Sequence, residues 1–229
     1  MRLDKFICKS TELTRTEAKK LLKKGEVTVN NEIITNPATQ VHENNDIRVD
    51  GRALVARKSR YIMLHKPIDT ICSNVDELYP SVLHFLDIDK AFDMHIAGRL
   101  DADTTGLVLI TDDGRWSHNI ISPKKSCKKT YRVWLRDILQ PDTAEKFANG
   151  VQLQGEKDLT RPAVLERVAP KEVLLTITEG KYHQVKRMFA AVGNKVVGLH
   201  RESIGGVKLD ELELGEWRYL TSDEVANFL

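Results

Sequence analysis

The amino-acid sequence predicts an α+β protein with a small α/β head at residues 1–60 and a body at residues 61–229. The sheet of the body is expected to be mixed and mostly antiparallel, flanked by helices and loops. Residues 1–60 carry 13 Lys and Arg against 8 Asp and Glu, whereas the remainder carries 22 against 25. Helical spacing of apolar residues marks the first 24 residues, and short strand patterns then follow one another with few helices between them. A basic head is typical of a module that docks on a polyanion, although a chance excess of solvated lysines gives the same charge.

The composition excludes several classes of protein. Of the 229 residues, 41% are hydrophobic and 30% are charged, as is usual for a soluble globular protein. No apolar run approaches the ~18 residues that cross a bilayer, and the N-terminal residues lack the apolar core of a secretory signal. The three cysteines lie far apart, which excludes a disulfide scaffold and a zinc ribbon. We therefore expect a cytoplasmic protein without a membrane partner.

Two short helices are predicted in the first 24 residues. The first has an apolar stripe that begins at Leu3, and the second opens on a capping box from Thr14 to Glu17 and closes at Gly25. The apolar stripes can pack together, which leaves the basic residues facing solvent or a ligand. These basic residues are Arg2 and Lys5 on the first helix and Arg15, Lys19 and Lys23 on the second.

Short strands at residues 26–29, 32–34 and 46–49 complete the head. Asn30-Asn31 is a turn dipeptide that tolerates positive φ. Residues 51–60 are basic and have no clear period, so we interpret them as a linker.

The body combines strands with two helices. Residues 61–66 form a strand that Pro67 stops, and residues 106–111 form a buried strand. Further strands are predicted at residues 130–135, 163–169, 173–178, 195–199 and 217–220, and helices at residues 142–149 and 182–192. Consecutive strands favour antiparallel neighbours in one sheet.

The segment from His95 to Gly106 is the densest candidate for chemistry. Gly98 and Gly106 bracket polar side chains that neither a strand nor a helix requires, directly before the buried strand. Loops that lead into rigid strands commonly carry reactive side chains. A turn that only reverses the chain explains these residue types equally well.

The predicted helix at residues 182–192 is a second candidate. His183, Lys186 and Arg187 project from the face opposite its apolar stripe. A solvated basic face is the commoner explanation of such residues. Cations near a helix N-terminus are unfavourable against the macrodipole, however, so they need a phosphate or a carboxylate as partner.

The lysines at residues 124–129, ahead of the strand that holds Tyr131, are a third candidate. They form either a solvated loop or a phosphate-binding surface, and a lone tyrosine in a strand is more often core than catalytic. The sequence contains no P-loop and no Gly-x-Gly-x-x-Gly motif, and its seven histidines show no metal-ligand spacing. We therefore expect a reaction that uses side chains alone, without a metal or a cofactor.

Three motifs resemble those of the pseudouridine synthases and follow in the order of that superfamily. They are Gly98-Arg99-Leu100-Asp101-x-x-Thr104-Thr105-Gly106, Lys129-Thr130-Tyr131 and Gly180-x-x-His183-Gln184-Val185-Lys186-Arg187-Met188. The N-terminal segment, with Leu3-Asp4-Lys5-Phe6, Thr14-Arg15 and Gly25-x-Val27-x-Val29-Asn30, is similar to an S4 RNA-binding domain. Thr14 stands where S4 domains often have Ser, a departure that preserves the helix cap. An S4 head before this catalytic body is the layout of the RsuA branch, and the resemblance covers essentially the whole chain.

The resemblance implies a cofactor-independent isomerase that flips one uridine of small-subunit (16S) ribosomal RNA, or of its assembly intermediate, and converts it to pseudouridine. Asp101 is then the nucleophile or base, Tyr131 stacks on the uracil, and Lys186 keeps the carboxylate charged. Arg99 is expected to help hold the flipped base. The remaining expected RNA contacts are Arg2, Lys5, Arg15, Lys19, Lys23, Lys128, Lys129, His183 and Arg187. We expect no metal, no membrane partner and a monomer.

Two other functions remain open at this point. An S4-tethered assembly factor would carry an inert body, but the joint presence of Asp101, Tyr131 and Lys186 argues against inertness. A hydrolase would use Asp101 and Asp103 as paired carboxylates, although two residues along one loop rarely converge on one substrate atom. Tritium release from RNA labelled with [5-³H]uridine separates the three functions, since only substitution at C5 liberates that label.

Overall fold

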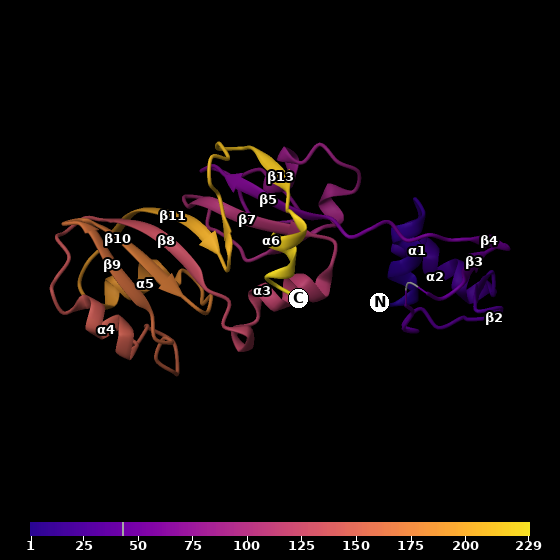
Figure 1. The fold of residues 1–229 in the computed structure, drawn as a ribbon, viewed down its shortest axis with the longest axis horizontal. Helices are drawn as coiled ribbons and strands as arrows, with labels where there is room; N and C mark the ends of the chain where they lie inside the picture. The colour runs from indigo at the N-terminus through magenta and orange to yellow at the C-terminus, as the bar shows by residue number, and fades with distance from the viewer. Residues whose placement is uncertain (43) are drawn as a thin grey trace. The chain divides into compact units, whose positions relative to one another are not determined.

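The computed structural model describes residues 1–42 and 44–229. The chain divides into two compact units, Met1–Lys58 and Ser59–Leu229, whose elements are labelled in Figure 1. The head therefore ends two residues before the boundary set from the sequence, and the body takes the rest.

In the head, two helices accompany a four-stranded sheet. The helices are α1 (Leu3–Ser10) and α2 (Arg15–Lys24), and the strand order is β2 (Glu32–Ile33), β1 (Val27–Val29), β3 (Ile47–Val49) and β4 (Arg52–Ala53). Thr14 and Glu17 form both hydrogen bonds of the capping box, and Gly25 ends α2 in the left-handed conformation. The apolar stripes of the two helices meet in one core, which includes Leu3 and Leu22.

The stretch interpreted as a linker begins with a strand. Arg52 and Ala53 pair with β3 across a turn at Asp50 and Gly51, both of which have positive φ. The two strand residues are exposed, so they leave no apolar pattern in the sequence. The interpretation of residues 51–60 as a linker is therefore wrong at its start.

In the body, the described residues form a nine-stranded sheet. Its main order is β13 (Trp217–Tyr219), β5 (Tyr61–Lys66), β7 (Thr105–Thr111), β11 (Val196–Ile204), β8 (Lys129–Leu135), β10 (Glu172–Ile177) and β9 (Val164–Ala169). In addition, β6 (His95–Ala97) pairs with β7, and β12 (Val207–Lys208) pairs with β11. Among these strand pairs, β7 and β11 alone run parallel, which confirms the predicted mixed and mostly antiparallel sheet.

Strands β5 and β7 contribute to two cores, because successive side chains of a strand point to opposite faces of its sheet. On one face, Met63 and Leu107 belong to the core that contains Trp116 of α3 (Gly114–Ile121). The short helix α6 (Ser222–Ala226) lies beside α3 in Figure 1, and the indole of Trp116 donates a hydrogen bond to the Val225 carbonyl oxygen.

On the other face, Val108 and Ile110 belong to the larger core. This core continues along the sheet to Phe147 of α4 (Thr143–Asn149) and Phe189 of α5 (Gln184–Ala191), whose rings pack edge to face. Figure 1 shows α4 and α5 against the β8–β10–β9 half of the sheet. Three short 3-10 helices connect the other elements, at Val82–Phe85, Ala91–Asp93 and Pro123–Lys125.

Two predicted elements differ from the structure by more than one residue at an end. The helix expected at residues 182–192 begins at Gln184, because His183 adopts a left-handed backbone with φ 46°. The strand expected at residues 195–199 continues to Ile204 as β11. α3, β6 and α6 have no counterpart in the sequence prediction, since each is short and mixes polar with apolar residues.

The parallel pairing of β7 and β11 depends on a glycine. Gly106 pairs with Arg201 and has φ +119°, and a Cβ atom added there would lie 2.3 Å from the Arg201 carbonyl oxygen. Gly106→Ala is expected to lower the free energy of unfolding by about 1–3 kcal/mol from backbone strain. The overlap with Arg201 adds to this loss. Thermal unfolding followed by circular dichroism measures the loss, at ~2–4 °C per kcal/mol for a chain of this size.

Gly155 provides the matched control for this prediction. Its φ is +80°, but a Cβ atom there would meet no heavy atom within 4 Å. Gly155→Ala carries the strain of a positive φ without the overlap, so its loss should be clearly smaller. Equal losses for the two variants would mean that the close approach of the strands does not require a glycine.

Candidate active site

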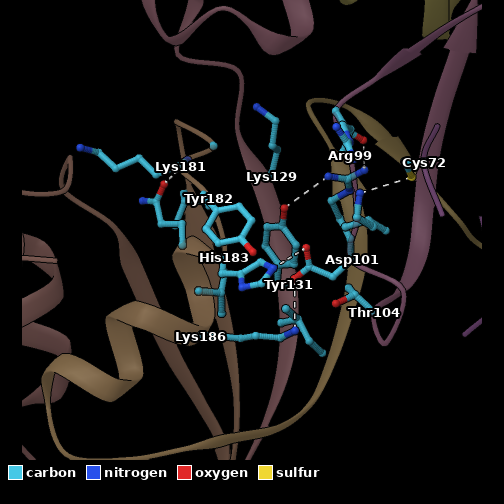
Figure 2. A pocket seen from close by; sticks show the side chains of 18 of the residues that line it. Cys72, Arg99, Asp101, Thr104, Lys129, Tyr131, Lys181, Tyr182, His183 and Lys186 are labelled. Carbon is cyan, nitrogen blue, oxygen red and sulfur yellow. Dashed lines mark hydrogen bonds and ion pairs between the residues drawn. The ribbon is translucent and has the colours of Figure 1, made fainter. Parts of the chain in front are cut away.

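A cavity of about 650 Å³ opens on the body, and several segments of the chain line it (Figure 2). The loop between β6 and β7 contributes Asp101, and strands β8 and β11 contribute Tyr131 and Arg201. The turn before α5 contributes His183, and α5 itself contributes Lys186. All three motifs singled out in the sequence therefore meet in one cavity.

A buried lysine donates hydrogen bonds to the loop that carries Asp101. Lys66, at the end of β5, is fully buried, and its ammonium donates hydrogen bonds to the carbonyl oxygens of Pro67, Ala102 and Thr104 at 2.9, 3.4 and 2.8 Å. Burial lowers the pKa of Lys66. Sequence patterns do not single out this residue, because a lysine at the end of a strand resembles any surface lysine.

Asp101 lies between the side chains of Lys186 and His183. Lys186 Nζ is 3.1 Å from Asp101 Oδ2, and His183 Nε2 is 3.2 Å from Asp101 Oδ1. The Asp101 side chain is 33% exposed, and the residue lines the cavity. The basic start of α5 thus has a carboxylate partner, one of the two partners expected from the sequence.

Lys186 also binds Asp103, at 2.7 Å and 3.0 Å from its two carboxylate oxygens. The hydrogen bond from Lys186 lowers the pKa of Asp103, although partial burial acts in the opposite direction. Burial alone would lower the pKa of Lys186, but its hydrogen bonds to Asp103 and Asp101 outweigh this effect and raise it. The ammonium is therefore a charged bridge between the two carboxylates.

His183 lies in a different place from the one expected. The sequence pattern puts it on a helix, as an RNA backbone contact, whereas its left-handed backbone places it just before α5. This conformation directs its ring to Asp101, as Figure 2 shows, and the ring stacks on Tyr182 with centroids 3.8 Å apart. Its partner in the structure is a carboxylate of the site.

Tyr131 is buried in β8 and lines the cavity. Its hydroxyl oxygen lies 3.3 Å from Nη1 of Arg201, which donates the hydrogen bond. Arg201 is almost fully buried, and it also donates to the carbonyl oxygens of Leu107 and Gly98 at 2.8 and 2.9 Å. One guanidinium therefore connects the tyrosine, strand β7 and the start of the Asp101 loop.

Arg201 is a residue of the site that the sequence motifs miss, although a signal for it exists. It stands two residues after the buried Leu199, on the apolar side of a strand. An arginine at an inward position of a strand is buried only when it has partners, so it indicates a structural or functional site.

The lysines ahead of Tyr131 divide into two kinds. Lys124, Lys125 and Lys128 are exposed, and Arg99 is exposed at the cavity. Lys129, however, is buried, and its ammonium donates to the carbonyl oxygens of Ile120 and Cys127 at 3.2 and 3.1 Å. Burial lowers its pKa. The ammonium of Lys129 thus has partners within the protein, while the residue also lines the cavity, and its contact with RNA stays a prediction.

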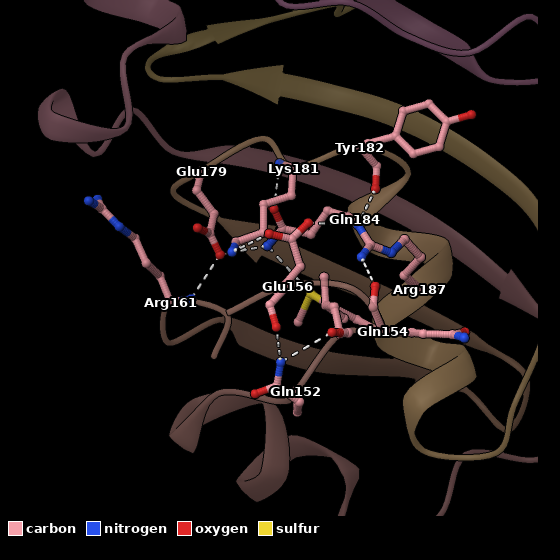
Figure 3. Close-up of polar contacts among 11 residues, drawn as sticks. Gln152, Gln154, Glu156, Arg161, Glu179, Lys181, Tyr182, Gln184 and Arg187 are labelled. Carbon is pink, nitrogen blue, oxygen red and sulfur yellow. Dashed lines mark hydrogen bonds and ion pairs between the residues drawn. The ribbon is translucent and has the colours of Figure 1, made fainter. Parts of the chain in front are cut away.

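Arg187, another expected RNA contact, binds groups of the protein in the structure. Its guanidinium donates to Glu156 Oε1 at 3.1 Å and to the carbonyl oxygens of Tyr182 and Gln154 at 2.9 and 2.6 Å (Figure 3). The same Glu156 carboxylate binds Lys181 at 3.1 Å. Arg187 therefore fixes the turn before α5 to the segment that holds Gln154 and Glu156.

In the head, two of the arginines expected to contact RNA bind a carboxylate of the protein. Arg2 and Arg15 bind the buried carboxylate of Asp4 at 2.9 and 3.2 Å. Burial alone would raise the pKa of Asp4, but the hydrogen bonds from the two arginines outweigh it and lower the pKa. Lys5 is half-buried, whereas Lys19 and Lys23 are exposed along α2, as the predicted basic stripe requires.

Residues 1–42 and 44–229 contain no helix long and apolar enough to span a membrane. Over the same two ranges, no group of three or more His, Cys, Asp or Glu side chains is placed to hold a metal ion.

Comparison with known proteins identifies both parts of the chain. The RNA pseudouridylate synthase family profile matches residues 60–191, and the S4 domain profile matches residues 1–47. The chain is similar to the ribosomal small subunit pseudouridine synthase A of Vibrio cholerae serotype O1, at 56% identity over 99% of both chains. It is 54% identical to the protein of that name from Escherichia coli strain K12, again over 99% of both.

The chain is also similar to a protein of known structure, described as a crystal structure of pseudouridylate synthase. Its chain is 48% identical in sequence and superposes with a TM-score of 0.74 over the full length of both chains. The three motifs that meet in one cavity all lie within the residues that the family profile matches. The chain belongs to the RNA pseudouridylate synthase family, whose enzymes are isomerases that need no cofactor.

Proposed function

We propose that this chain converts a uridine of small-subunit ribosomal RNA to pseudouridine, with Asp101 as the carboxylate that acts on the target nucleoside. The observation that carries this proposal is the position of Asp101 in the cavity, between Lys186 and His183 and near the buried Tyr131. The substrate is proposed from the two relatives, which are named for the small ribosomal subunit and align with nearly all of the chain.

The reaction exchanges one bond for another. The glycosidic bond between C1′ and N1 breaks, the uracil turns, and C1′ rejoins the base at C5. The hydrogen at C5 leaves as a proton, and N1 gains a proton, so the composition of the nucleoside is unchanged. No atom of another reactant is added, so one ionised carboxylate suffices, either as nucleophile at C1′ or as base toward the ribose. Asp101 serves in either route.

The target base must leave its stack to reach Asp101, at a cost of a few kcal/mol. A cavity of about 650 Å³ lies within the range that holds a small organic ligand. In this proposal the ring of Tyr131 forms one wall for the flipped uracil, and the hydrogen bond from Arg201 to its hydroxyl keeps that wall in place. The exposed guanidinium of Arg99 is proposed to hold the flipped conformation, and Lys186 and His183 orient the carboxylate.

Tritium release tests the proposal. Small-subunit ribosomal RNA labelled with [5-³H]uridine is incubated with the protein, and label that enters water is counted. We expect release that saturates at a small number of tritium atoms per RNA, and sequencing of RNA from a deletion strain then locates the uridine. Binding without release would indicate an inert assembly factor. Free uracil without release of tritium would indicate a hydrolase.

The basic stripe of α2 is proposed to bind phosphates and to contribute to affinity. Lys19→Gln together with Lys23→Gln should weaken RNA binding, and should flatten the slope of log K against log salt by about 1.5 units, at about 0.7–0.9 per phosphate contact. Arg15 is left intact because it also binds Asp4. Binding titrations across a salt series measure the slope, and the single-turnover rate at saturating RNA should stay within a few-fold of the wild-type rate.

The matched control removes the same charge from other positions of α2. Lys20 and Lys24 are exposed there one residue further along, so their side chains point about 100° away from the stripe. Lys20→Gln together with Lys24→Gln should change the slope by clearly less. If the two double variants behave alike, the head carries only a diffuse positive charge and the stripe is not a docking surface.

A further inference from the structure

Tyr182 is an unusual residue at the rim of the cavity. Its side chain is 75% exposed, which makes it the most exposed aromatic residue in the described part of the chain. One side of its ring stacks on His183, with centroids 3.8 Å apart and planes at 19°. The high exposure leaves the other side of the ring open to solvent, beside the cavity that it lines (Figure 2).

The backbone on both sides of Tyr182 is fixed by polar contacts (Figure 3). Its own carbonyl oxygen accepts a hydrogen bond from Arg187, which Glu156 and the Gln154 carbonyl hold in turn. The amide of Lys181 donates to Gln184 Oε1 at 2.9 Å.

A second set of bonds supports Gln184. Its amide donates at 2.9 Å to the buried carboxylate of Glu179, which also accepts from the Arg161 backbone N–H at 2.8 Å. Two ion pairs and several hydrogen bonds thus hold a turn whose aromatic side chain buries little surface of its own. The network fixes the position of the ring relative to Asp101, because the next residue, His183, binds that carboxylate at 3.2 Å.

We propose that Tyr182 is a stacking platform for the nucleobase next to the target uridine, an inference that rests on the proposed function. A base that flips leaves its neighbour without a stacking partner. An aromatic ring replaces such a partner for any base, since every base has a π-face. Tyr182 has the open face, the fixed position and the place at the rim that this role requires, whereas the buried Tyr131 suits the target base inside the cavity.

The test uses a fragment of small-subunit ribosomal RNA that spans the mapped uridine, labelled with [5-³H]uridine. A second fragment carries an abasic residue at the neighbouring position. Tyr182→Leu removes the ring but keeps an apolar side chain, and its high exposure spares the fold. We expect this variant to bind the intact fragment about 5- to 150-fold more weakly, as the loss of one base–aromatic stack does. Because the ring also stacks on His183, which binds Asp101, we expect the rate at saturating RNA to change less than the affinity does.

Three comparisons make the test specific. Tyr182→Phe keeps the ring and should retain most of the affinity. On the abasic fragment, wild type and Tyr182→Leu should bind alike, because the stack is already absent. Tyr219→Leu removes another exposed tyrosine, on β13, and should leave binding unchanged. The abasic residue is placed on the 5′ side of the target in one fragment and on the 3′ side in another, which identifies the neighbour.

Each other outcome has a defined meaning. An equal loss of affinity on intact and abasic fragments overturns the proposed stacking on the neighbouring base. A loss of rate at saturation with unchanged affinity also overturns it, and would instead assign Tyr182 to the positioning of His183 and Asp101. Wild-type protein that binds the fragment but releases no tritium refutes the proposed function instead. The binding comparison still tests the stack in that case, so the two failures are distinguishable.

Discussion

Asp101→Asn is expected to lower the single-turnover rate of pseudouridine formation by about 10³-fold or more, while RNA affinity stays within a few-fold of the wild-type value. Asparagine keeps the shape of the side chain and removes its charge and nucleophilicity. Lys186 remains anchored in this variant, because Asp103 binds it independently at 2.7 Å. The loss would therefore report on Asp101 itself. Tritium release under single-turnover conditions measures the rate, and filter binding measures the affinity.

Asp103 provides the matched variant for this prediction. It lies two residues along the same loop and shares Lys186, but its side chain is 72% exposed. Asp103→Asn should keep most of the turnover that Asp101→Asn loses. Residual activity of Asp101→Asn well above one part in about 10³, with a larger loss in Asp103→Asn, would assign the reaction to Asp103.

Lys186→Met is expected to lower the same rate by about 10²–10³-fold, the usual effect of removing a charged group that stabilises a reacting centre. RNA affinity should fall far less, since the ammonium faces two carboxylates. Its pKa is raised by the hydrogen bonds to Asp103 and Asp101, so the group stays charged across about pH 6–9. The titration of Lys186 should therefore leave no inflection in the wild-type rate within this range, and rates of the wild type measured at several pH values check this.

Lys186→Arg keeps the positive charge and should recover part of the rate. If instead affinity collapsed in Lys186→Met while the rate at saturating RNA held, Lys186 would be a phosphate contact. The ion pairs with Asp101 and Asp103 would then describe only the protein without RNA.

The sequence is sufficient for the parts of the site that are local. The motif around Asp101 predicts a polar loop before a buried strand, and the structure has that loop between β6 and β7. Cations at the start of a helix need an anionic partner, which predicts a carboxylate or a phosphate near Lys186. Asp101 is such a carboxylate. Both inferences depend on neighbours within a few residues or on one electrostatic rule.

Other features depend on residues far apart in the chain. Arg187 looks like a free cation until Glu156, 31 residues away, is found beside it. Lys129 looks exposed until the carbonyl oxygen of Ile120 is found at its ammonium. His183 follows a helical pattern, but a left-handed backbone at a residue other than glycine is uncommon, and periodicity does not indicate it. Patterns in the sequence therefore single out candidate site residues, but they do not reveal which distant residues are the partners.

The parallel junction of the sheet has a mechanical consequence. Asp101 precedes β7, whereas Tyr131, His183 and Lys186 belong to the half of the body built on β8 and α5. The two halves meet where β7 pairs with β11 through two residue pairs, and Arg201 spans this seam from β11 to Leu107 and Gly98. A small rotation about so short a seam would move the carboxylate relative to Tyr131 and Lys186 while each half stayed intact. Arg201 is thus the buried side chain that connects the two halves across this seam, and it does so beside the cavity that Asp101, Tyr131 and Lys186 line.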